Sequence, residues 1–190
     1  MVFIQLNERY RADCNELVKL FLPENSYTYI DEDGSEPDLC QDSMDDSRPC
    51  LKFNKTISGL EISATDHLIQ FETRKSGDMN FLMGILSQGG QVLFRDEIPV
   101  PNQKPDPDKN LMMPLKLMIY SLLNRFTGKT LPWGALTGIR PVKLVNALLH
   151  EGESVDGIFR KMQEHCRVSG EKTRLAVEVA LNEEKYLSVP

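Results

Sequence analysis

The densest group of residues that could do chemistry lies at positions 131–141. This stretch contains the sole tryptophan of the chain, Trp133, together with Arg140, two glycines and two prolines. Pro132 and Pro141 fix their own φ angles and disfavour a helical conformation in the residue before them, so we expect an ordered, non-helical crossing. Arg140 would lie just before a helix N-terminus, where unpaired amides and the helix dipole attract anions. The stretch therefore predicts an anion-binding corner.

Two cations would line this corner. Arg140 comes directly before the expected helix, and Lys143 lies in its first turn, near the free amide of Val142. A guanidinium can grip a carboxylate through two parallel hydrogen bonds, so a substrate with several carboxylates would suit the pair. The alternative is that Arg140 pairs with an acidic side chain of its own domain while Trp133 belongs to the core. The candidate residues for contact with a substrate or a catalytic core are Trp133, Thr137, Gly138, Arg140 and Lys143.

Two amphipathic helices are expected to hold the corner in place. Upstream, apolar residues recur at the i, i+3, i+4 spacing over residues 115–126, and Gly128 suits the position just after a helix. Downstream, Pro141 suits the first position of a helix that would end at Gly152. The corner should therefore be a fixed connection between two packed elements.

Two further helices are predicted after this one. Ser154 can cap the first, and Ser169 can open the second. The residues expected to pack inward are Val155, Ile158, Phe159 and Met162 in the first helix and Leu175, Ala176, Val179 and Ala180 in the second. Three short helices joined by tight turns also permit a helix-turn-helix DNA reader, with the Ser169 helix as the recognition element. The mixed charge at the start of that helix and the acidic total weigh against it.

The opening of the chain predicts a β-α-β unit. It consists of a strand at 2–6, a helix at 10–22 that Asn7 can cap, and a strand at 26–30. Residues 81–86 permit either a strand or a short helix. Other segments with strand character are 51–53, 59–64, 67–73 and 91–98.

The fold class that follows is α+β. Residues 1–107 should form a small β-rich domain with one early helix, and residues 108–190 a bundle of about four helices. Residues 100–108, which hold three prolines, would link the two.

Acidic residues crowd positions 31–49, where we expect a solvated loop. Calcium binding is an alternative reading of this segment. An EF-hand loop that began at Asp31 would need glycine at its sixth position, and Glu36 stands there instead. The spacing therefore argues against calcium. The acidic residues are Asp31, Glu32, Asp33, Glu36, Asp38, Asp42, Asp45 and Asp46.

Other residues that could do chemistry have simpler interpretations. Cys14 on the early helix reads as a small buried hydrophobe, and His67 as a turn-edge residue at the start of a strand. His165 and Cys166 are adjacent on a helix and point to different faces, which disfavours a shared metal. Residues 128–130 imitate the tail of a phosphate-binding loop, but the earlier glycine and the preceding strand are missing.

Composition sets broad limits on function. The chain of 190 residues is 41% hydrophobic and 26% charged, which is typical of a globular protein. Its net charge of −6 argues against a general nucleic-acid surface. We expect no membrane partner, because no apolar run is long enough to span a bilayer. Scattered cysteines and the lack of an export signal favour a cytoplasmic location with free thiols.

The corner also carries a family resemblance. Together with residues 168–180, it resembles the region upstream of the catalytic core in oxygen-independent coproporphyrinogen III oxidase-like proteins, the HemZ branch of the radical-SAM enzymes. The resemblance is specific for the last third of the chain, loose at the opening strand and helix, and not traced through residues 50–110. The runs that carry it are Phe126-Thr127-Gly128-Lys129, Leu131-Pro132-Trp133-Gly134 and Leu136-Thr137-Gly138-Ile139-Arg140-Pro141, followed by Lys143.

The resemblance implies an anaerobic tetrapyrrole pathway, that of haem biosynthesis. Members of the family are oxidoreductases that use S-adenosylmethionine and a four-iron, four-sulfur cluster to convert propionate side chains of coproporphyrinogen III to vinyl groups. Their cluster loop has the spacing Cys-x3-Cys-x2-Cys, which Cys14, Cys40, Cys50 and Cys166 do not provide. The resemblance therefore implies that both cofactors bind in a core expected after Pro190, and that this chain is a non-catalytic N-terminal segment. A stand-alone interaction module is the alternative.

Overall fold

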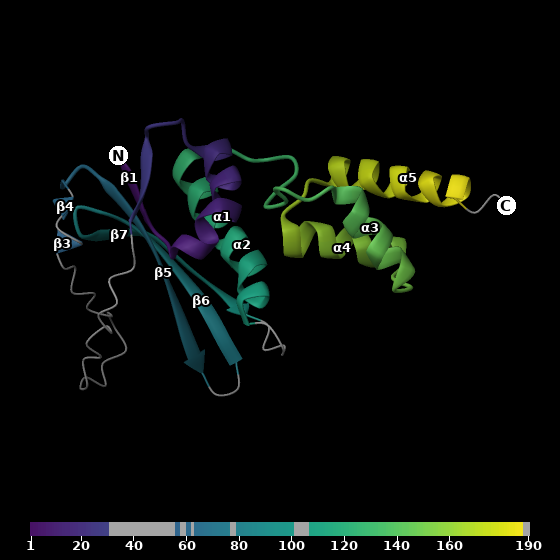
Figure 1. Ribbon diagram of the computed structural model, residues 1–190, viewed down its shortest axis with the longest axis horizontal. Helices are drawn as coiled ribbons and strands as arrows, with labels where there is room; N and C mark the ends of the chain where they lie inside the picture. Colours follow the sequence, from purple (N-terminus) through teal and green to yellow (C-terminus); the bar gives the residue numbers. More distant parts are fainter. Residues whose placement is uncertain (31–55, 58–59, 62, 77–78, 101–106, 188–190) are drawn as a thin grey trace.

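The computed structural model describes residues 1–30, 56–57, 60–61, 63–76, 79–100 and 107–187 (Figure 1). It confirms the α+β class, with a five-stranded sheet and five helices in these ranges. The strands are β1 (Val2–Gln5), β2 (Tyr27–Ile30), β3 (Thr56–Ile57), β4 (Leu60–Glu61), β5 (His67–Ser76), β6 (Met79–Gln88) and β7 (Gln91–Val100). The helices are α1 (Glu8–Phe21), α2 (Pro107–Thr127), α3 (Pro141–His150), α4 (Val155–Cys166) and α5 (Gly170–Leu187).

The predicted β-α-β unit opens the chain. β1 pairs in parallel with β2, and α1 makes the connection between them. Asn7 caps α1 as expected, since its side-chain oxygen accepts a hydrogen bond from the Arg9 N–H (3.2 Å). β1 also pairs in parallel with β5, so this short apolar strand lies inside the sheet.

The sheet has the strand order β2-β1-β5-β6-β7. β5, β6 and β7 form an antiparallel meander. Residues 81–86, whose sequence permitted two structures, lie in β6, which is hydrogen-bonded on both sides. Pairing with two long neighbours gives the backbone groups of this segment partners on both sides, which favours the strand.

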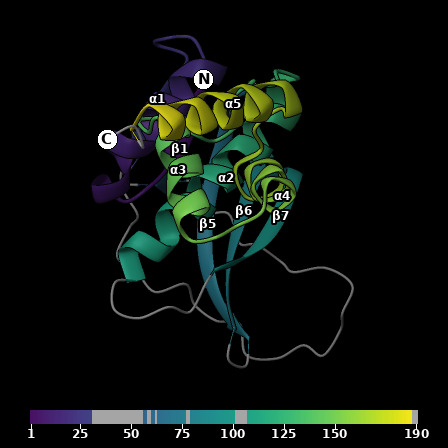
Figure 2. The same cartoon turned by 90° about the vertical axis from the view of Figure 1, so that its right-hand side faces the viewer.

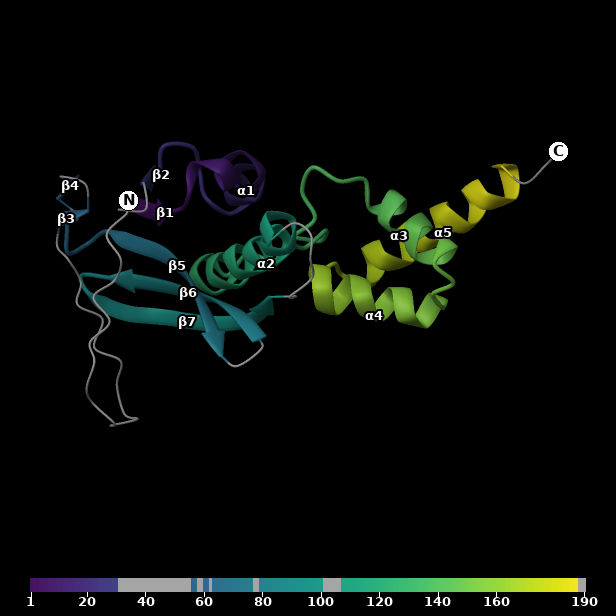
Figure 3. The same ribbon diagram turned by 60° about the horizontal axis from the view of Figure 1, so that its bottom comes forward.

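The second helix lies on the sheet beside α1 (Figure 3). Its apolar residues, which include Leu115, Met118 and Leu122, join the same buried cluster as β1, β5, β6 and α1. A Cβ atom at Gly84 on β6 would collide with Met118, so this glycine lets α2 approach the strand closely. The bundle of about four helices expected from residue 108 is therefore not clearly matched. The division of the chain at 107/108 stays a prediction.

The helices α3, α4 and α5 pack around a second apolar cluster (Figure 2). Ala176 and Ala180 face inward on α5 as predicted, but Leu175 and Val179 are 45% and 37% exposed. The inward face of α5 is instead completed by Thr173 and Val177, in the spacing i, i+3, i+4, i+7. On α4, Ile158, Met162 and Phe159 face this cluster, whereas Val155 is exposed, contrary to the prediction.

Both cysteines that the structure describes are buried free thiols. Burial raises the pKa of Cys14 to about 12 and that of Cys166 to about 11, so both stay protonated near neutral pH. The interpretation of Cys14 as a small buried hydrophobe is confirmed. His165 is exposed next to buried Cys166, which confirms that they occupy different faces.

Several expectations fall on parts of the chain that are not described. The acidic segment 31–49, its calcium alternative and the strand at 51–53 lie outside the described residues, as does the linker except at its ends. Within the described residues, no helix is both long and apolar enough to cross a membrane.

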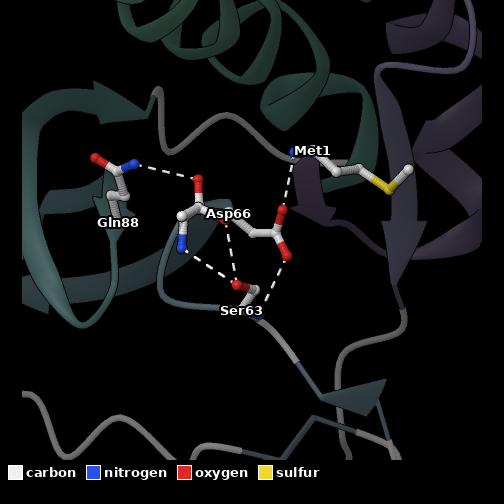
Figure 4. Close-up of polar contacts among 5 residues, drawn as sticks. Met1, Ser63, Asp66 and Gln88 are labelled. Atoms are coloured by element: carbon white, nitrogen blue, oxygen red, sulfur yellow. Dashed lines mark hydrogen bonds and ion pairs between the residues drawn. The ribbon is translucent and has the colours of Figure 1, made fainter.

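A small polar cluster ties the start of the chain to the turn before β5 (Figure 4). The Met1 ammonium donates to Asp66 Oδ1 (2.9 Å), and the Ser63 N–H donates to Asp66 Oδ2 (3.1 Å). These donors, the ammonium first, hold the pKa of the Asp66 carboxyl below its usual value. Gln88 Nε2 donates to Thr65 O (3.1 Å), which ties the same turn to the end of β6.

His67 begins β5 beside this cluster, the turn-edge position that its sequence context predicts. Its ring centroid lies 4.6 Å from that of Phe126 on α2. Burial, followed by the nearby chain ammonium, lowers the pKa of His67 below its usual value. The neutral ring is therefore the form that the fold prefers.

We predict that the free energy of unfolding falls as the pH drops below 6.5, the ordinary histidine value. Because the folded-state pKa of His67 is lowered, its contribution is present above this value and is lost as protons bind the unfolded chain. One such group contributes at most about 1.4 kcal/mol per pH unit. Urea unfolding at about pH 7, 6 and 5 measures the slope, and His67→Gln should flatten it. An unchanged slope in His67→Gln would contradict the prediction.

Candidate anion-binding site

The corner begins where α2 ends. Gly128 has a φ of 70° and its N–H donates to Asn124 O (2.8 Å), so it terminates the helix as predicted. Lys129 Nζ donates to Phe21 O (2.7 Å), the last residue of α1. Lys129, which imitates the lysine of a phosphate-binding loop in sequence, therefore satisfies a helix C-terminal carbonyl.

The backbone of the corner is fixed by hydrogen bonds to the end of α4 and to the link between α4 and α5. The Ala135 N–H donates to Cys166 O (2.8 Å), and the Ser169 N–H donates to Pro132 O (2.9 Å). Two turns add local bonds, including one from the Leu136 N–H to Trp133 O (3.1 Å). These contacts confirm the ordered, non-helical crossing.

Gly134 is the point of closest approach in the corner. Its φ of 57° is in the left-handed region, and a Cβ atom there would overlap Cys166 O and the backbone of Arg167. Glycine therefore meets two requirements at this position, backbone conformation and space.

Trp133 is half-buried and packs against the cluster of α3, α4 and α5. Lys172 Nζ lies 5.8 Å from the centroid of its ring. A cation over an indole face is a stabilising arrangement, so one face of Trp133 already has a partner. Its contact with the helical cluster matches the alternative that Trp133 belongs to the core, while its predicted contact with a substrate or a catalytic core stays a prediction.

The two predicted cations lie at the other end of the corner. Pro141 is the first residue of α3, and Arg140 precedes it with extended backbone angles (φ −73°, ψ 117°) and no side-chain capping bond. Arg140 and Lys143 are both exposed. In the described ranges neither side chain forms an ion pair or a hydrogen bond, so the alternative acidic partner for Arg140 is not found there.

Thr137 connects the corner to the sheet half of the molecule. It is 9% exposed, and its carbonyl oxygen accepts a hydrogen bond from Lys116 Nζ on α2 (3.2 Å). The neighbouring Gly138 is exposed, with a φ of 72° and open space around it. The sequence analysis did not single out Lys116, because a lysine beside apolar helix residues usually keeps its ammonium in water.

The structure therefore brings Thr137, Gly138, Arg140 and Lys143 together on one short segment and sets Trp133 apart in the helical cluster. Positive charge and an unpaired amide at a helix N-terminus can bind and orient an anion. Among the described residues, no group of three or more His, Cys, Asp or Glu side chains is placed to hold a metal ion.

An open hollow of about 510 Å³ lies elsewhere, between α1 and β2. The Tyr27 and Tyr29 hydroxyls both donate to Asn15 Oδ1 there, at 2.8 and 3.4 Å. None of the predicted site residues lines this hollow.

Comparisons with known proteins gave no match to a family model, a curated protein or a solved structure. The family assignment therefore remains a prediction that rests on the resemblance of the corner and its flanks.

We predict that Gly134→Ala lowers the free energy of unfolding by about 3 kcal/mol or more, because both the left-handed conformation and the backbone overlap are penalised. Gly138→Ala is the matched control, since it bears only the conformational penalty of roughly 1–2 kcal/mol. Urea denaturation followed by circular dichroism measures both variants. Equal losses in the two would show that the corner does not pack on the α4–α5 link as described.

Proposed function

We propose that this chain is the N-terminal accessory segment of a radical-SAM oxidoreductase that acts on coproporphyrinogen III in haem biosynthesis. In this proposal the segment is non-catalytic, and the iron–sulfur cluster and S-adenosylmethionine bind in a core further along the polypeptide, in the cytoplasm. The resemblance at the corner supports the pathway. The geometry supports the role, which is to present positive charge to an anionic substrate next to that core.

The observation that carries the role is the state of Arg140 and Lys143. Even an exposed cation that forms an ion pair contributes little to the stability of a fold. Arg140 and Lys143 also lie beside the positive end of a helix dipole, so stability gives little reason to keep them there. Each would be mildly destabilising there without an anion. Because hydrogen bonds hold the corner on both sides, the cations can meet a carboxylate without a large ordering cost.

Exposed apolar residues in the corner and on α5 favour an attached core as well. Ile139 is 47% exposed immediately before Arg140, and Leu175 and Val179 form an apolar stripe on the outer face of α5. We propose that the rest of the polypeptide covers these residues and so places the corner next to its substrate.

An interaction module that acts alone is the second candidate, and the same apolar stripe supports it. A helix-turn-helix DNA reader is less well supported. The recognition helix would be α5, and Lys172 in its first turn lies over Trp133 while Thr173 is fully buried. These two side chains are therefore engaged within the protein, and the exposed residues at the start of α5, Glu171 and Arg174, carry opposite charges.

We predict that Arg140→Ala in the full-length protein raises the KM for coproporphyrinogen III by about tenfold to a hundredfold, the value of one charge-assisted hydrogen-bond pair. Arg140→Lys should restore only part of the loss, because an ammonium cannot bind a carboxylate bidentately. Anaerobic turnover with measured consumption of the substrate reports KM and kcat separately.

The control variant is Arg95→Ala, which removes an exposed arginine from β7 with the same change in charge. It should leave KM unchanged. If Arg140→Ala folds normally, as shown by its urea midpoint, and keeps the wild-type KM, the proposed role of the corner is wrong.

A further inference from the structure

Lys116 is a buried cation with very little to neutralise it. The residue is 6% exposed on α2, and its Nζ donates one hydrogen bond, to Thr137 O (3.2 Å). No carboxylate in the described part of the chain forms an ion pair with it. An ammonium has three donors and is costly to remove from water, so two donors and a full charge remain to be satisfied.

Thr137 also has a buried polar group without a hydrogen-bond partner, its side-chain Oγ1. The carbonyl oxygen that binds Lys116 and this hydroxyl belong to the same residue, so they are separated by only a few covalent bonds. Two buried side chains with unsatisfied donors therefore meet at Thr137, and buried polar groups in native proteins are seldom left without partners.

The Cys14 thiol, a second polar group near Lys116, does not supply an anion. The Lys116 charge acts to lower the pKa of Cys14, but burial outweighs it and raises that pKa to about 12. The thiol is therefore neutral near pH 7 and only a weak acceptor. Gly138, which follows Thr137 directly, is exposed and has open space where a side chain would lie.

We propose that Lys116 and Thr137 form the inner end of an oxyanion-binding site, in which one oxygen of a carboxylate or phosphate group accepts hydrogen bonds from Lys116 Nζ and Thr137 Oγ1. Arg140, three residues further along the corner, would meet the outer part of the same ligand. This inference rests on the proposed anion-binding role of the corner and deepens it. The buried contact would favour an anion whose oxygen can accept hydrogen bonds over an anion such as chloride. A charge-assisted hydrogen bond is also stronger in a buried setting than at the surface.

The test is thermal unfolding of the 190-residue chain in phosphate, in succinate and in sodium chloride at equal ionic strength. We expect phosphate or succinate to raise the Tm above the chloride value in a saturable way, as a ligand that binds only the folded state does. The two anions distinguish a phosphate ligand from a carboxylate ligand. Lys116→Met and Thr137→Val should each weaken the apparent affinity by roughly tenfold to a hundredfold.

Both variants keep the approximate shape of the side chain that they replace, and Thr137→Ser should retain binding because it keeps the hydroxyl. If Lys116→Met does not fold, Thr137→Val still decides the result. The matched charge control is Lys75→Met, which removes an exposed lysine from β5 and should leave the shift intact. An equal anion shift in Lys116→Met and wild type, or no shift in wild type, overturns the inner site.

Arg140→Ala separates this inference from the proposed function. A shift lost in Lys116→Met but kept in Arg140→Ala supports the inner site and contradicts the outer contact. A shift lost in Arg140→Ala but kept in Lys116→Met and Thr137→Val overturns the inner site and leaves the proposed function standing.

Discussion

The structure depends most on the contact between the backbone of the corner and the link that joins α4 to α5. Two hydrogen bonds, from Ala135 to Cys166 and from Ser169 to Pro132, join segments that are more than thirty residues apart. The contact is possible because Gly134 has no side chain and Arg167 itself adopts a left-handed conformation at the end of α4. It fixes the direction in which the chain enters α3, and with it the position of Arg140.

The same corner is held on its other side by helices of the sheet half. Lys129 binds the last carbonyl of α1, and Lys116 binds Thr137 from α2. Lys116 places its charge inside the protein, whereas Lys129, Arg140 and Lys143 are exposed. The contrast matters because an exposed cation costs little to keep, but a buried one costs several kcal/mol unless it is neutralised. Lys116 therefore points to a ligand more strongly than Arg140 does.

Local signals in the sequence predicted the ends of elements well. Asn7, Ser154, Pro141 and Gly128 each act through their own backbone or side chain, so their effects do not depend on distant neighbours. Packing partners were harder to predict. The periodic apolar face of α2 could pack on other helices or on a sheet equally well. The spacing of its apolar residues does not show that Met118 packs against Gly84 on β6. Leu175 and Val179 were misplaced for the same reason, because apolar residues occur on several faces of α5.

The candidate site shows the same division between local and distant effects. Arg140 and Lys143 were predicted because Pro141 marks a helix start, and the structure places both beside that start. Lys116 was not, because a lysine in an apolar helix usually extends its stem along the surface and keeps its ammonium in water. Whether it does so depends on what lies over the helix, here a carbonyl twenty-one residues further along the chain. A residue of this kind is recognised only when the chain is folded, and its unmet donors then become the most specific evidence for what the corner binds.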